Sequence, residues 1–281
     1  MASIKKEQLV GMNQHYKKYY FDYFLDAQQR VGFQNIELWL GAPHFWLDSI
    51  SYDDCKVIKK KVAEHGLQIV SVTSPSMAYQ YQYASQEKYQ FEQSFKYFLN
   101  GIKATAELGA KIMTINSGWG YWNDEFDIVF ERSKDMIGRL CNVAVSEGIV
   151  LAMESLTSAE SNIVDNITNA KRMFDEINHP ALKIMVDTIA TGFAKETTSR
   201  WFEVFGKDLI HIHFVDGDYS TYAHYIWGDG QYPLEKELQC LNDNHYRGYL
   251  VQEIADVDKY YDNPILADME NMKMFFRFVE D

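Results

Sequence analysis

The chain has 281 residues, of which 47% are hydrophobic, 15% aromatic and 24% charged. This composition is typical of a globular protein with a large core and excludes a mainly disordered chain. The 27 basic and 40 acidic residues give a formal net charge of −13. Because binding to nucleic acid or to anionic lipid depends on a basic surface, we expect neither nucleic acid nor a membrane as a partner.

The cysteines point to a reducing compartment. Cys55, Cys141 and Cys240 are odd in number, lie far apart and form no CxxC pair, whereas disulfide-stabilised proteins usually carry paired cysteines. The first residues lack the apolar core of a signal peptide, and nowhere do about 18 apolar residues follow one another. The sequence therefore predicts a cytoplasmic protein without a transmembrane helix.

Short apolar, β-branched runs alternate with longer amphipathic stretches along the chain. No Pro/Ser-rich linker divides them, so we expect one domain over residues 1–281. The apolar runs predict strands at 9–14, 34–39, 67–73, 110–116, 149–154, 182–187, 209–214 and 248–253. Helical stretches between them include 88–108, 125–147 and 162–177.

Glycines punctuate this pattern, because a glycine just past a helix accepts the left-handed conformation that ends it. Gly109 and Gly148 each follow a predicted helix and precede a predicted strand. Strands that alternate with helices in this number predict an α/β fold, a closed (β/α)8 TIM barrel, rather than an open doubly wound sheet. The chain also lacks a GxGxxG motif after its first strand, which is needed for the dinucleotide-binding form of the open fold.

In such a barrel the active site forms at the carboxyl ends of the strands. The last four predicted strands carry polar residues at or next to their ends, namely Glu154, Asp187, His213 and Glu253. Carboxylate and imidazole groups together suit Mn²⁺, Mg²⁺ or Co²⁺ and, less decisively, Zn²⁺. The alternative is that each is an ordinary polar residue of the barrel mouth. Three converging acids would repel one another, however, and one divalent cation is the simplest way to neutralise them.

These four strand-end residues resemble the ligand set of the xylose-isomerase-like barrel superfamily, which includes ketose 3-epimerases, hydroxypyruvate isomerase, inosose dehydratase and endonuclease IV. The resemblance covers nearly the whole chain. Several stretches look most like the fructoselysine 3-epimerase family, namely IELWLGAPH at 36–44, ESNIV at 160–164, VDGD at 215–218 and HYIWGDGQYPL at 224–234. The resemblance implies one divalent metal held by the four residues, proton transfer by Glu154 and Glu253, a substrate contact by Glu160, and a homo-oligomer.

Two positions depart from the free-sugar members of the superfamily. Thr188 follows the aspartate where those enzymes carry a histidine. The loop after the seventh strand contains Tyr219, Ser220 and Thr221 where they carry an arginine. These departures favour a ketose-amine conjugate such as fructoselysine over a free ketose such as psicose or tagatose.

Epimerisation beside a carbonyl removes a proton from one face of the substrate and returns one to the other face. A metal on the carbonyl and the neighbouring hydroxyl stabilises the enediolate, and two bases on opposite faces move the proton. Glu154 and Glu253 belong to strands five and eight, so they can flank a substrate in the mouth. The sequence therefore predicts a metal-dependent C3 epimerase of a small sugar substrate.

Further residues near the predicted mouth are weaker candidates for substrate contact: His44, Trp119, Asp216, His224 and Trp227. Their alternatives are a solvated histidine, turn capping for the aspartate, and packing for the tryptophans. His211 is expected to be a hydrogen-bonded residue beneath His213, and Glu37 either binds substrate or satisfies polar groups of the mouth. Residues 79–83 belong to a long loop after the third strand that could form a lid.

Other functions remain open at this point. A free-ketose 3-epimerase and an aldose–ketose isomerase would use the same enediolate. An endonuclease-IV-like phosphodiesterase needs a larger ligand ring and a basic DNA track, which the acidic balance disfavours. A sugar-binding module without catalysis would not require two opposed proton carriers.

Overall fold

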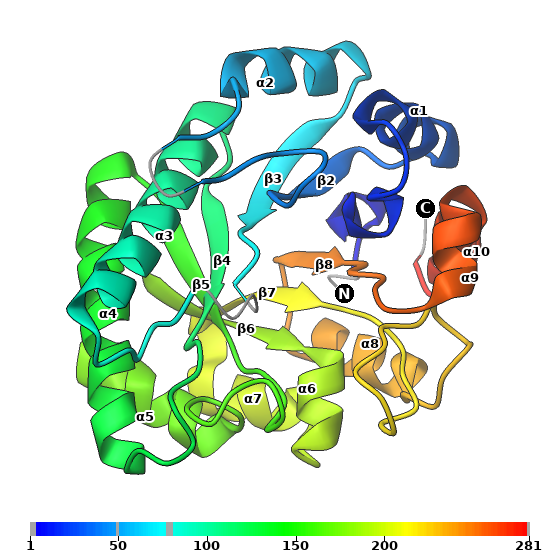
Figure 1. Ribbon diagram of the computed structural model, residues 1–281. Helices are drawn as coiled ribbons and strands as arrows, with labels where there is room; N and C mark the ends of the chain where they lie inside the picture. The colour runs from blue at the N-terminus through cyan, green and yellow to red at the C-terminus, as the bar shows by residue number, and fades with distance from the viewer. Residues whose placement is uncertain (1–3, 49–50, 77–80, 280–281) are drawn as a thin grey trace.

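The computed structural model describes residues 4–48, 51–76 and 81–279 (Figure 1). Its strands form one closed parallel barrel in which each strand pairs with the next in sequence and β8 pairs with β1. The strands are β1 (Leu9–Met12), β2 (Asn35–Trp39), β3 (Gln68–Thr73), β4 (Ile112–Asn116), β5 (Val150–Glu154), β6 (Leu182–Asp187), β7 (Leu209–His213) and β8 (Tyr249–Val251). The predicted (β/α)8 barrel is confirmed.

Helices surround the barrel, as Figure 1 shows. They are α1 (Phe21–Val31), α2 (Cys55–Glu64), α3 (Lys88–Leu108), α4 (Phe126–Glu147), α5 (Ile167–Ile177), α6 (Thr188–Phe193), α7 (Thr198–Phe205), α8 (Leu234–Asp243), α9 (Asp258–Asp262) and α10 (Pro264–Phe275). Short 3-10 turns are η1 (Lys6–Gln8), η2 (Gln14–Tyr16) and η3 (Gly206–Asp208). Within the described part of the chain, none of the helices is both long enough and apolar enough to cross a bilayer.

Local chemistry sets the ends of the helices. Gly109 and Gly148 end α3 and α4 with φ angles of 88° and 68°, as the sequence predicts. The helix expected at 162–177 instead begins at Ile167, because the Asn166 side chain accepts a hydrogen bond from the backbone N–H of Asn169. The residues before it form a loop in which Asn162 bonds the backbone of Gly120 in both directions.

The strands around the mouth are shorter than the sequence suggests on one side of the barrel. The strand predicted at 248–253 ends at Val251, and the strand predicted at 9–14 ends at Met12. One backbone bond continues the pairing beyond β8, from the N–H of Gln252 to the carbonyl oxygen of Val10 at 3.0 Å. Glu253 therefore lies after its strand and is held by other contacts than the strand ladder.

Candidate active site

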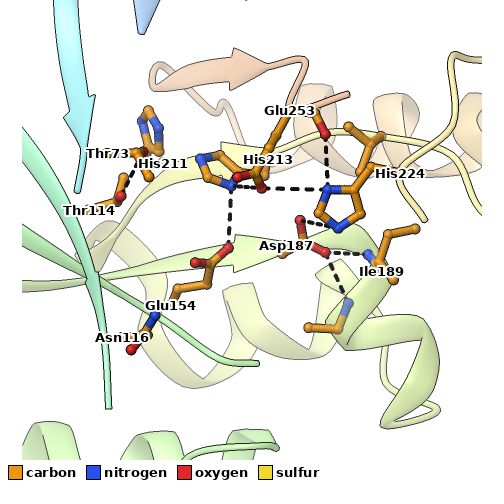
Figure 2. Close-up of polar contacts among 12 residues, drawn as sticks. Thr73, Thr114, Asn116, Glu154, Asp187, Ile189, His211, His213, His224 and Glu253 are labelled. Atoms are coloured by element: carbon orange, nitrogen blue, oxygen red, sulfur yellow. Dashed lines mark hydrogen bonds and ion pairs between the residues drawn. The ribbon is translucent and has the colours of Figure 1, made fainter. Parts of the chain in front are cut away.

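The structure brings together the four residues predicted at the strand ends. Glu154, Asp187 and His213 are the last residues of β5, β6 and β7, and Glu253 lies two residues after β8. Each offers one ligand atom, and these atoms lie within 4.8 Å of one another. Figure 2 shows the four side chains converging from neighbouring strands. The barrel mouth thus gathers three carboxylates and one imidazole at a single point.

Asp187 has one oxygen in use and one that faces the cluster. Its Oδ1 accepts hydrogen bonds from the backbone N–H groups of Ile189 and Ala190, at 2.6 and 3.0 Å, and so caps α6. Its Oδ2 is buried and accepts no hydrogen bond from the described residues. The Nε2 atom of His224 lies 3.8 Å away from Oδ2. Buried polar atoms in proteins are usually hydrogen-bonded, so this unpaired oxygen is a candidate ligand atom for a bound cation or substrate.

The orientation of His213 is fixed from below. Its Nε2 lies 2.9 Å from Oε1 of Glu37, which as a carboxylate accepts a hydrogen bond from it. Its Nδ1 faces the cluster, 2.7 Å from Oε2 of Glu253 and 3.3 Å from Oε1 of Glu154. Both distances are within ion-pair range. With Nε2 bonded to Glu37, Nδ1 is the ring atom that faces the three acids and that would bind a metal.

Burial and mutual repulsion perturb the acids. Burial, with the charges of Glu253 and Asp187, raises the pKa of Glu154 to about 7, although His213 acts in the opposite direction. Burial also raises the pKa of Asp187. In Glu253 burial acts upward, but His213 and His224 outweigh it, so the pKa of Glu253 falls below its ordinary value. The acids compete for the few positive charges near them, as at a site built to hold a cation.

The residues present fit a divalent metal. Each of the four residues offers one donor atom to the same point. These atoms are Oδ2 of Asp187, Nδ1 of His213 and one carboxylate oxygen from each glutamate. This donor set is typical of sites for Mn²⁺, Mg²⁺ or Co²⁺. It differs from a structural zinc site, which usually contains thiolates.

A cavity of about 190 Å³ opens at the cluster. Glu154, Asp187 and Glu253 form part of its wall, together with two residues predicted to contact substrate, Glu160 and His224. The Oε2 atom of Glu160 accepts hydrogen bonds from the backbone N–H and the hydroxyl of Thr157, at 3.0 and 2.8 Å. None of the described residues that line this cavity is a lysine or an arginine. The wall is therefore acidic.

His224 is hydrogen-bonded to the backbone of Glu253. Its Nδ1–H donates to the carbonyl oxygen of Glu253 at 2.9 Å, and its ring lies between Glu253 and Asp187 (Figure 2). Burial lowers the pKa of His224, but the charges of Asp187 and Glu253 outweigh burial, and the pKa rises.

Other predicted contacts lie away from this cavity wall. Asp216 is 1% exposed, and both its oxygens accept backbone N–H groups of the loop after β7, at 2.8 to 3.0 Å. The indole N–H of Trp227 donates to the carbonyl oxygen of Phe214 at 2.7 Å, and the ring packs against Phe214 and Phe275. In the structure Asp216 thus caps the loop and Trp227 packs in the core, and neither is among the described residues that line the cavity.

His44 and Trp119 are also absent from the described lining of the cavity. Burial lowers the pKa of His44, and its Nε2 lies 2.7 Å from the carbonyl oxygen of Tyr19. The ring of Trp119 packs edge-on against Tyr121. Residues 79 and 80 of the predicted lid lie outside the described residues, whereas Tyr81 stacks on a tyrosine of α3 and Tyr83 is fully buried.

The sequence did not single out several cavity residues. Gln14 lines the wall from the start of η2, and Tyr222 and Asp256 line it from the loops after β7 and β8. Loop residues carry no periodic signal. Their position at or beyond the carboxyl end of a predicted strand is the one clue that could have found them.

A polar layer lies beneath the ligand cluster inside the barrel. Glu37 is fully buried and accepts four hydrogen bonds. Two come from the rings of His211 and His213, at 2.7 and 2.9 Å. The other two come from the hydroxyls of Ser71 and Thr73, at 2.5 and 2.6 Å. Burial acts to raise the pKa of Glu37, but the two histidines outweigh it and hold the pKa well below its ordinary value. Glu37 therefore satisfies and orients histidines instead of facing the cavity.

Comparisons with known proteins agree with this geometry. The family model described as "Xylose isomerase-like TIM barrel" matches residues 25–275. The chain is similar to fructoselysine 3-epimerase of Shigella flexneri, with 27% identity over 90% of each chain. It is also similar to D-psicose 3-epimerase of Ruminiclostridium cellulolyticum, with 18% identity over 83% of this chain and 78% of the relative.

Solved structures show the same fold. A D-tagatose 3-epimerase-like protein superimposes with a TM-score of 0.81 at 14% identity, covering 97% of this chain and 98% of the other. A 3-keto-D-glucoside 4-epimerase from E. coli gives 0.78 at 17% identity, covering 96% and 100%. With the family model matching most of its length and with these relatives, the chain belongs to the xylose isomerase-like TIM barrel family, as an enzyme of the isomerase and epimerase type.

Proposed function

We propose that the protein is a metal-dependent epimerase that inverts C3 of a ketose-amine conjugate of the fructoselysine type. The observation that carries the proposal is the convergence of Glu154, Asp187, His213 and Glu253 on one point of the barrel mouth. The likeness to fructoselysine 3-epimerase over 90% of both chains supports the choice of reaction.

The four residues would hold one divalent cation, which would supply Lewis-acid polarisation of the substrate carbonyl and so make the C3 hydrogen more acidic. Glu154 and Glu253 reach the cluster from β5 and from the end of β8, with Nδ1 of His213 between them. One glutamate removes the C3 proton and the other returns a proton to the opposite face, and their roles exchange in the reverse direction. Glu160 binds a sugar hydroxyl from the cavity wall.

The charge of the cavity supports an amine-bearing substrate. Glu160 and Asp256 add two carboxylates to the wall beyond the ligand cluster, and no lysine or arginine among the described lining residues offsets them. Such a wall repels sugar phosphates and attracts the ammonium group of a ketose-amine. A free ketose such as psicose is the alternative substrate, since a relative at 18% identity is a D-psicose 3-epimerase.

The decisive experiment is deuterium incorporation at C3 from D₂O, with the Mn²⁺-loaded enzyme and a panel of fructoselysine, psicose, tagatose and fructose. We expect exchange at C3 that is fastest with fructoselysine. Glu154→Gln and Glu253→Gln should each reduce the exchange rate by about 10²- to 10⁴-fold, the usual contribution of a positioned acid or base. Glu203→Gln, at an exposed pair with Arg200, is the matched control and should leave the rate unchanged.

The outcomes separate the proposals. A glutamine variant that retains metal and still exchanges at the wild-type rate would remove the two-base mechanism. An aldose product identifies an aldose–ketose isomerase, because the proton then returns to the adjacent carbon. A metal-loaded protein that is inert toward every ketose would indicate a binding module, and hydrolysis of abasic DNA would indicate a phosphodiesterase.

A further inference from the structure

A second buried carboxylate lies outside the barrel, on α10. Asp268 is fully buried and accepts four hydrogen bonds from side chains that are themselves fully buried. Its Oδ1 accepts from Nε2 of His15 at 2.9 Å and from Nε2 of Gln252 at 2.5 Å. Its Oδ2 accepts from the hydroxyl of Tyr16 and from Nε2 of Gln28, both at 2.5 Å. The proposed reaction uses none of these groups.

The two oxygens differ in whether a partner adjoins a proposed metal ligand: Gln252, on Oδ1, directly precedes Glu253, whereas Tyr16 and Gln28, on Oδ2, adjoin none of the four ligands. His15 directly follows Gln14, and Gln252 directly precedes Glu253, and both of these neighbours line the cavity. One oxygen, Oδ1, therefore joins two segments of the cavity wall that are distant in sequence. The partners of Oδ2 are not adjacent in sequence to a residue of the wall.

Glu253 needs such a support because its strand has ended. β8 stops at Val251, so only the N–H of Gln252 continues the pairing with β1. The Gln252 side chain reaches α10, where its Nε2 donates to Asp268 and its Oε1 accepts from Nδ2 of Asn271 at 2.9 Å. Both ends of the amide are thus occupied, and the side chain is fully buried. The Gln252 side chain thus ties the backbone just before Glu253 to α10.

We propose that Asp268 is a positioning residue that, through Gln252, holds the Glu253 carboxylate at the ligand cluster. The inference rests on the proposed function in that it takes Glu253 as a metal ligand and proton carrier. Asp268 touches neither metal nor substrate. Asp268 acts on Glu253 through the side chain of Gln252 and the peptide unit that joins Gln252 to Glu253. Residues behind metal ligands generally orient the ligands in this indirect way.

The test compares two substitutions that each remove one donor from Asp268. Gln252→Met removes a bond to Oδ1 from the residue next to Glu253, and Tyr16→Phe removes a bond to Oδ2 from a residue that adjoins none of the four proposed ligands. Both variants should lose stability to urea. Only Gln252→Met should also weaken Mn²⁺ binding by about 10-fold or more, the usual effect of losing a partner behind a ligand. It should also lower kcat for C3 exchange more than it changes KM.

Equal effects of the two substitutions on Mn²⁺ affinity, or no effect of either, would make the network merely structural and overturn the inference. If Gln252→Met does not fold, Gln252→Asn keeps the amide and shortens the side chain by one methylene. It should still weaken Mn²⁺ binding, and wild-type affinity in this variant would also overturn the inference.

The readouts also separate this inference from the proposed reaction. Mn²⁺ affinity, and the position of the Glu253 carboxylate in a crystal structure of Gln252→Met, need no turnover. A wild-type protein that binds Mn²⁺ without exchanging C3 on any ketose contradicts the proposed function alone. A Glu253 carboxylate that keeps its place beside Nδ1 of His213 in the Gln252→Met crystal structure contradicts the positioning role alone.

Discussion

Glu37 and Asp268 are both fully buried carboxylates with four hydrogen-bond donors, but they lie in different regions of the fold. Glu37 lies inside the barrel, beneath the mouth, and its donors are two imidazoles and two hydroxyls. Asp268 lies on α10, which packs against α1 outside the barrel (Figure 1), and its donors are an imidazole, a phenol and two amides. A fold can thus satisfy a buried acid with quite different partners.

The difference lies in the distance from each acid to the proposed chemistry. Glu37 contacts a proposed metal ligand, His213, through one hydrogen bond. Asp268 reaches Glu253 only through the side chain and the peptide unit of Gln252. Removing either carboxylate would leave its buried donor groups without an acceptor. Both acids therefore contribute to the free energy of unfolding. Changes at either acid should lower stability, and metal binding should respond more strongly to changes at Glu37, which contacts a proposed ligand directly.

The largest expected effect is on stability at Asp268. Asp268→Asn places an NH₂ group opposite side chains that all donate, so at least two of the four bonds are lost in a buried site. We expect the free energy of unfolding to fall by about 3–5 kcal/mol. Urea denaturation measures it, and Glu270→Gln is the control on the same helix, since its pair with Lys273 is exposed. A loss of less than about 1 kcal/mol would contradict a role for charge in this network.

Metal removal should separate the two regions. A ligand present at 100 times its Kd stabilises a folded protein by about 2.7 kcal/mol, so chelation with EDTA should lower Tm measurably. Hydrogen exchange should rise most at the ends of β5 to β7 and much less around α10, because Asp187 and His213 lose a shared partner while Asp268 keeps all of its donors. Uniform acceleration across the chain would contradict this separation.

Glu37→Gln should weaken metal binding as well as lower stability. The glutamine oxygen can accept a proton from one histidine, but its NH₂ group then faces the donor of the other. The Nε2 proton of His213 is no longer fixed, and Mn²⁺ affinity should fall by about 10- to 100-fold. Isothermal titration with Mn²⁺ measures the loss. Affinity within about twofold of wild type, with only stability changed, would show that Glu37 does not orient the ligand.

The barrel could be predicted because the evidence for it is local. Each strand is a short apolar run, and glycines end the preceding helices, as at Gly109 and Gly148. Parallel strands of a closed barrel bring their carboxyl ends together, so Glu154, Asp187 and His213 could be placed at one mouth without coordinates.

The remaining details depend on contacts between distant segments. Glu253 lies beyond β8, where a residue of α10 supports its neighbour, and nothing in the sequence around 248–253 shows this. Whether Trp227 faces a cavity depends on the carbonyl of Phe214 and the ring of Phe275. Sequence patterns report which faces are apolar, but they do not report which polar atoms are already paired.

The smallest expected effect tests how far the polar layer extends. The Thr73 hydroxyl donates to Glu37, so at its 2.7 Å contact with Thr114 it must accept, and Thr114 must donate (Figure 2). Thr114→Val keeps the shape of the side chain and removes only this outer bond, so the loss of stability should be about 0.5–1.5 kcal/mol. Mn²⁺ affinity should stay within about twofold of wild type, because all four donors to Glu37 remain and the effect of an outer partner weakens with each further step from the metal. If the affinity instead falls as far as in Glu37→Gln, the orientation of His213 depends on a chain of hydrogen bonds that runs from β7 through β2 and β3 to β4. Glu37 and Asp268 would then differ in how their hydrogen-bond networks connect to the proposed ligands, and not in how many steps separate them from the metal.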